Sequence, residues 1–195
     1  MDDVSAIVVL DPEVSAPHSE VPASWLSLAA DHEVVWIGSD QDAAARWDAL
    51  VAGLDGGYAV VAGGAEAEAA LDLAERTDLA PSAVLLVDPG TEALPPGAPA
   101  LSAAEEWMRR TAERRGALHD RGTEVRLISA SVGGSADRVA APLPLGHPDV
   151  VAAVENALAG AESAEDFDDP EDFADAAGVD PTPEQVDEYR HQVER

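Results

Sequence analysis

Two adjacent glycines, Gly63 and Gly64, stand between a strand-like run and a helix-like segment. Backbone amides at such a junction can bind an anion, because the first N–H groups of a helix have no partner within it. Neither GxGxxG nor GxxxxGK(S/T) occurs in the chain, so the usual nucleotide-binding patterns are missing. Glu66 and Glu68 in the first helical turns would also repel a phosphate. A tight turn is therefore the favoured interpretation of the glycine pair, and a ligand-binding turn is the alternative.

The chain has few other residues whose types and spacing suit catalysis or metal binding. The chain has no cysteine, which excludes disulfides, a thiolate nucleophile and cysteine-ligated metals. Its five histidines are scattered, with no ligand pattern such as HExxH. We therefore expect neither a metal nor a cofactor.

The charge balance excludes one large class of partner. Of 195 residues, 39 are acidic and 11 are basic, which gives a net charge of −28, and every basic residue is an arginine. Nucleic-acid affinity comes from neutralising phosphates with Lys and Arg, so we expect no nucleic-acid partner. No apolar run approaches the ~18 residues of a membrane span, and the first residues are acidic, so we predict a cytoplasmic protein without a membrane partner. High-salt adaptation, coding bias and solubility each explain the acidity without a specific function.

Alternating strands and helices are expected to position the glycine pair and the other candidate residues. Five short runs rich in Val, Ile and Leu predict buried strands, at 6–10, 33–37, 58–62, 83–87 and 124–128. Helical patterns lie between and after them, at 22–30, 41–54, 65–76, from about 102 onward, and at 148–160. Strands that are apolar on both faces and alternate with helices indicate a mainly parallel sheet covered on both sides. We predict an α/β fold over residues 1–160, a three-layer doubly wound sheet with five core strands.

In such sheets, ligands bind near the carboxyl ends of the strands. The residues at those predicted ends are Asp11, Ser39-Asp40, Gly63-Gly64, Asp88 and Ser129–Ser135.

Six of the eleven arginines fall between Arg109 and Arg126. Glu105 and Glu106 precede Arg109 and Arg110 by four residues, a spacing typical of ion pairs along one exposed helix. The alternative is that these six arginines bind the acidic C-terminal segment, residues 161–195, either within the chain or from a second copy in a homo-oligomer.

The composition changes after Gly160. Residues 161–181 are strongly acidic, contain both phenylalanines, Phe167 and Phe173, and predict a disordered linker. Residues 182–195 predict a short amphipathic helix with Tyr189 in its apolar stripe. Either the segment is a solvated linker, or Phe167, Phe173 and Tyr189 contact a protein partner. The helix predicted at 182–195 either packs on the domain or binds a partner.

Several clusters, taken in chain order, resemble the α/β-hydrolase family. They are Ile7–Pro12, Ser24–Leu26, Val60–Ala74, Ala83–Pro89, Gly134–Val139 and Gly146–Pro148. The resemblance covers about residues 5–160, leaves no room for a cap domain, and implies a compact hydrolase fold. It implies that Asp137 stands at the position of the catalytic acid and His147 at that of the histidine.

The family carries its nucleophile in a Gly-x-Ser-x-Gly elbow. The matching stretch is Ala62–Glu66, with Gly64 at the serine position, so the acyl-enzyme mechanism has no nucleophile there. We therefore predict a non-catalytic α/β-hydrolase-like binding or scaffolding protein, in which Asp137 is a loop residue and His147 caps a helix. The alternative is a small serine hydrolase of esters or thioesters. Its candidate nucleophiles outside the elbow are Ser39, Ser129, Ser131 and Ser135.

Overall fold

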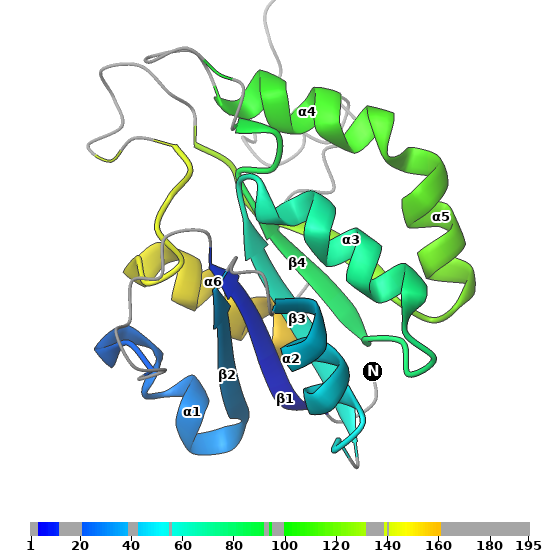
Figure 1. The fold of residues 1–195 in the computed structure, drawn as a ribbon. Coiled ribbons are helices and arrows are strands. Elements are labelled where there is room, and N and C mark those ends of the chain that lie inside the picture. Colours follow the sequence, from blue (N-terminus) through cyan, green and yellow to red (C-terminus); the bar gives the residue numbers. More distant parts are fainter. Residues whose placement is uncertain are drawn as a thin grey trace, which may run out of the picture. The chain divides into compact units, whose positions relative to one another are not determined.

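The computed structural model describes residues 4–11, 21–38, 43–54, 56–91, 94, 100–131, 139 and 141–160. The predicted linker and terminal helix, residues 161–195, lie outside these ranges. The described chain forms one parallel sheet in the order β2-β1-β3-β4-β5 (Figure 1). Its strands are β1 Val4–Asp11, β2 Glu33–Gly38, β3 Gly57–Gly63, β4 Ala83–Val87 and β5 Glu124–Ser129. The prediction of a three-layer α/β fold with five parallel core strands is confirmed.

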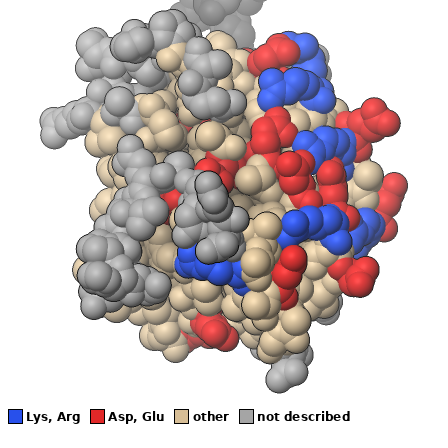
Figure 2. Space-filling view, viewed as in Figure 1, with Lys and Arg blue, Asp and Glu red and all other residues tan. Residues whose placement is uncertain are grey.

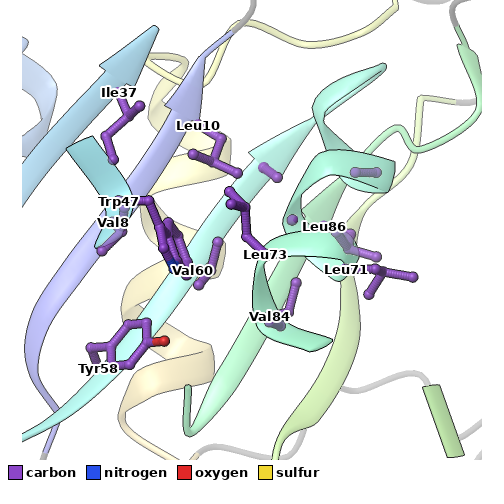
Figure 3. Packing of buried hydrophobic residues seen from close by; sticks show 14 of the residues in the cluster. Val8, Leu10, Ile37, Trp47, Tyr58, Val60, Leu71, Leu73, Val84 and Leu86 are labelled. Atoms are coloured by element: carbon purple, nitrogen blue, oxygen red, sulfur yellow. The ribbon is translucent and has the colours of Figure 1, made fainter. Parts of the chain in front are cut away.

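One face of the sheet is covered by α2 (Ala43–Val51), α3 (Glu66–Arg76), α4 (Ala100–Arg110) and α5 (Ala112–Asp120). The core on this side contains Trp47 and Leu71, packed with strand residues such as Val60 and Leu86 (Figure 3). Trp47 also meets Tyr58 edge to face, with ring centroids 5.8 Å apart.

The other face is covered by the 3₁₀-helix η1 (Ala23–Trp25), by α1 (Leu28–Asp31) and by α6 (Pro148–Leu158). Trp25 and Val154 pack there against Ile7 and Val9, whereas Val8 of the same strand belongs to the first core. Successive residues of a strand point to opposite faces, so two covered faces require strands that are apolar throughout. This is the pattern from which the fold was predicted.

Two predicted helices differ from the structure. The segment 22–30 forms two short pieces, η1 and α1, and the helix expected from about 102 begins at Ala100 and is interrupted at Thr111. Thr111 has φ −93° and ψ 6°, and its hydroxyl donates to the Trp107 carbonyl at 2.9 Å. A threonine hydroxyl that bonds four residues back distorts a helix, which accounts for the change of direction between α4 and α5.

Candidate functional site

The candidate site lies where the winding of the sheet reverses, between β1 and β3. The connection from β1 to β2 runs over the face that carries η1 and α1, and the connection from β2 to β3 runs over the opposite face through α2. In open α/β sheets, ligands bind beyond the carboxyl ends of the strands at this point. The structure brings together here the ends of β1, β3 and β4, at Asp11, Gly63-Gly64 and Asp88.

The glycine turn after β3 is buried and tightly covered. Gly64 has φ +53°, in the left-handed region that favours glycine, and its N–H donates to the Val87 carbonyl at 2.9 Å. A Cβ atom at Gly64 would lie 3.0 Å from Pro142 Cγ and 3.7 Å from Thr91 Oγ1. A Cβ atom at Gly63 would lie 3.1 Å from Leu145 Cδ2. A side chain at Gly64 or Gly63 would therefore require Pro142 or Leu145 to shift by a few tenths of an ångström, and the amide of Gly64 already has an acceptor.

Residues 141–147, which we call the cover segment, enclose this turn and are fixed from two sides. The Trp25 indole N–H donates to the Leu145 carbonyl at 2.9 Å, and the Ser24 hydroxyl donates to the Gly146 carbonyl at 2.8 Å. On the other side, the Leu143 N–H donates to Asp88 Oδ2 at 2.8 Å. Side chains of η1 and of Asp88, the residue after β4, together hold the cover segment over the glycine turn.

Asp88, directly after β4, has several hydrogen-bond partners. It is fully buried and has φ +46°, which is uncommon for a residue other than glycine. Its carboxylate accepts from the Ser131 N–H at 2.5 Å, from the Ser131 hydroxyl at 2.7 Å and from the Leu143 N–H. Its own backbone carbonyl accepts from the Thr91 hydroxyl at 2.8 Å. Asp88 therefore ties the chain after β5 and the cover segment to the end of β4.

Two carboxyl groups lie at the reversal point itself. Asp11 ends β1 and is only 5% exposed, and Glu66 opens α3 directly after the glycine turn. Burial raises the pKa of Glu66, and the nearby charge of Asp11 raises it further. A carboxyl group held closer to its neutral form has the property of a general acid, but the described turn offers it no nucleophile to assist. The same pair of acids disfavours an anionic ligand at the glycine turn.

His147 begins α6 as its N-cap. Its Nδ1 accepts from the Asp149 N–H at 3.3 Å and lies 3.6 Å from Asp149 Oδ2, and Pro148 occupies the first helical position. This is the helix-capping geometry expected for His147. Asp137 falls outside the described residues, as do Phe167, Phe173 and Tyr189, so their functions remain predictions. The ligand-binding interpretation of Gly63 and Gly64 also remains a prediction.

Of the four candidate serine nucleophiles, Ser129 and Ser131 are described and Ser39 and Ser135 are not. Ser131 is 4% exposed, and its hydroxyl donates to Asp88 rather than to a histidine. Ser129 is half-buried, and its carbonyl accepts from the Asp88 N–H at 2.9 Å. The group that faces the Ser131 hydroxyl is thus the buried Asp88 carboxylate, and within the described ranges no hydrogen bond joins either serine to a histidine.

The arginines between Arg109 and Arg126 are engaged with acids and carbonyl groups of the domain itself. Arg114 of α5 bonds Glu68, Asp72 and Glu75 of α3 at 2.6–2.9 Å, and the bond to Glu75 raises its pKa. Arg110 bonds Glu68 rather than Glu106, which pairs with Arg109. Figure 2 shows the resulting mixture of basic and acidic side chains on this face. Docking of the acidic C-terminal segment on this strip remains a prediction.

The described ranges contain no helix long and apolar enough to cross a membrane, and no group of three or more His, Asp or Glu arranged to hold a metal. Comparison of the chain with protein-family models, with curated proteins and with solved structures gave no match.

From the sequence, Asp88 was predicted only to follow a strand. Its position at the centre of a hydrogen-bond network was not predicted. The available signal was an acid directly after five buried apolar residues, followed by Pro89-Gly90. A buried strand that ends in an acid must satisfy that acid with hydrogen bonds. The partners, Ser131 and Leu143, are 43 and 55 residues away, so the sequence alone could not identify them.

Proposed function

We propose that this protein is a non-catalytic α/β-hydrolase-like binding or scaffolding protein that lacks the family's nucleophile. The strand order β2-β1-β3-β4-β5 supports the proposal, because the central strands of the hydrolase fold are wound in this way. Other flavodoxin-like sheets share the order, so the resemblance depends on the residue clusters as well.

The observation that carries the proposal is the geometry of Gly64. The residue sits at the elbow between β3 and α3 with φ +53°, as a strained strand-to-helix turn requires. A functional elbow presents a side chain to the substrate, whereas a Cβ atom here would crowd Pro142 at 3.0 Å. The turn has the positive φ expected of an elbow, and Pro142 would have to shift before this position could carry a nucleophile.

The binding function is proposed for the acidic C-terminal segment. Its spaced aromatic residues, Phe167, Phe173 and Tyr189, would contact a protein partner while the surrounding acids keep the segment solvated. Partner binding then requires neither Asp137 nor His147, and this separates the proposal from a working hydrolase.

Turnover of short acyl esters and thioesters tests the non-catalytic part. The purified full chain is compared with Asp137→Ala, with His147→Ala and with buffer alone. We expect all four to give the same rate. If the unmodified chain exceeds the buffer rate and either substitution lowers its turnover about 10²-fold or more, the protein is a small serine hydrolase with a nucleophile outside the elbow.

Quantitative capture from a native lysate tests the binding part. The chain carrying Phe167→Ala, Phe173→Ala and Tyr189→Ala is compared with the unmodified chain and with His147→Ala. We expect the triple variant to lose the proteins that the unmodified chain retains and His147→Ala to keep them. Equal retention by all three chains would contradict a binding function for the aromatic segment.

A further inference from the structure

β5, the strand at one end of the sheet, is less buried than its neighbour β4. It is last in the strand order, so within the described chain it pairs with a strand on one side alone, through β4. All six residues of β5 are half-buried, whereas all five residues of β4 are buried. A parallel edge of this kind presents backbone groups that can pair with another chain.

The register identifies which backbone groups face outward. The Glu124 N–H donates to the Ser82 carbonyl at 3.0 Å, and Glu124 and Val125 lie opposite Ala83 and Val84. In a ladder, the N–H and C=O of one residue point to the same side, and those of the next residue point to the other. The N–H and C=O of Val125 therefore point away from β4, as do those of Leu127.

The opposite edge of the sheet is protected differently. There the Trp36 carbonyl of β2 accepts a hydrogen bond from the Arg46 guanidinium at 3.2 Å, so this carbonyl has a side-chain partner within the chain. On β5 the arginine at the edge, Arg126, bonds instead with the side chain of Glu124.

We propose that the edge of β5 pairs with the same strand of a second copy of this chain, antiparallel and about a two-fold axis at Val125. In this register Val125 exchanges both backbone hydrogen bonds with the partner's Val125. Glu124 then lies directly opposite the partner's Arg126, in the non-hydrogen-bonded positions where side chains approach closest. The interface is isologous, because each copy contributes the same strand.

The charges of Glu124 and Arg126 favour this register over those with the two-fold axis at Arg126 or at Leu127. A two-fold axis at Arg126 would place that arginine opposite the partner's Arg126, and like charges directly opposite are destabilising. An axis at Leu127 would place Arg126 opposite the partner's Ile128. With the axis at Val125, Glu124 and Arg126 lie on one face with their counterparts and form a cluster of four charges of alternating sign.

The net charge of −28 sets the conditions for the experiment, since two copies repel each other at long range. At about 0.15 M salt the screening length is about 8 Å, which weakens that repulsion more than contacts within the interface. Sedimentation velocity of the full chain at this salt, from nanomolar to high micromolar concentration, is expected to reveal a species of twice the 20.2 kDa chain mass.

Charge reversal tests the register. Arg126→Glu and Glu124→Arg each place like charges opposite one another, so each variant is expected to sediment as a monomer. An equimolar mixture of the two is expected to recover the dimer, because their charges complement one another, and the double variant Glu124→Arg/Arg126→Glu is expected to dimerise alone. Far-UV circular dichroism and melting of each variant show that the domain is folded.

A monomer at every concentration of the unmodified chain would overturn the proposal and would assign Glu124 and Arg126 to keeping the edge unpaired. A dimer that both single variants retain would also overturn it, and would assign dimerisation to another surface, such as residues 161–195 docked on the arginines of α5.

Discussion

Replacing Gly64 with alanine is expected to lower the free energy of unfolding by about 2–5 kcal/mol. One part of this loss is conformational, because an L-residue at φ +53° costs about 1–2 kcal/mol. The other part is crowding, since the added methyl group would lie 3.0 Å from Pro142 Cγ and 3.3 Å from Pro142 Cβ. Overpacking of this kind costs about 1–3 kcal/mol.

Gly122 provides a matched control for the conformational part. It has φ +87°, and a Cβ atom there would meet nothing within 4 Å. Gly122→Ala is therefore expected to cost only the backbone contribution of about 1–2 kcal/mol. Both substitutions restrict the unfolded chain alike, so this effect cancels when they are compared.

Urea unfolding followed by tryptophan fluorescence measures both variants, since Trp25, Trp47 and Trp107 are buried. If Gly64→Ala and Gly122→Ala cost the same within about 0.5 kcal/mol, then the cover segment does not enclose the turn.

Three other substitutions give expected outcomes. Asp88→Ala leaves two N–H groups and a hydroxyl of Ser131 and Leu143 without their acceptor, and is expected to lower stability by about 3–5 kcal/mol in urea unfolding; a loss below about 1 kcal/mol would show that the network is absent in solution. The raised pKa of Glu66 means that the folded state favours its protonated form, so its contribution is favourable at low pH and is lost as the pH rises through the folded pKa. Glu66→Gln is therefore expected to stabilise the protein at pH 7 and to lose this stabilisation below pH 4.5, the ordinary pKa of a glutamate. A stabilisation that persists in acid would show that the charge of Glu66 is not its cause. Arg114→Ala is expected to cost about 1 kcal/mol at low salt and less at high salt, because its partners on α3 are partly exposed; a cost independent of salt would point to packing instead.

The strands were predictable because each is apolar on both faces, as Val8 and Val9 illustrate by entering opposite cores. Their alternation with helices then restricts the connections to right-handed crossovers, which leaves few arrangements of the sheet. The break at Thr111 was not predictable from hydrophobic periodicity. It arises from a single hydroxyl that bonds the Trp107 carbonyl, and many threonines in helices face solvent instead.

The glycine turn was also predictable, since two glycines between a strand and a helix indicate a backbone that needs positive φ. What covers the turn was not. Pro142 is 78 residues from Gly64 along the chain, and its position depends on hydrogen bonds from Trp25 and to Asp88. The arginines illustrate the same limit. The spacing predicted a pair between Glu106 and Arg110, but Arg110, the last residue of α4, bonds Glu68 of α3, which is 42 residues away along the chain.

Intact-mass spectrometry of the full chain after incubation with a broad fluorophosphonate probe tests whether the protein carries an activated serine. The probe forms a covalent adduct with a serine only where the hydroxyl is activated as a nucleophile. With glycine at position 64, in the turn between β3 and α3, and the Ser131 hydroxyl bonded to Asp88, we predict an unchanged mass under conditions in which a known serine hydrolase is fully labelled. A stoichiometric increase in mass would contradict the account, and the labelled peptide would identify the nucleophile.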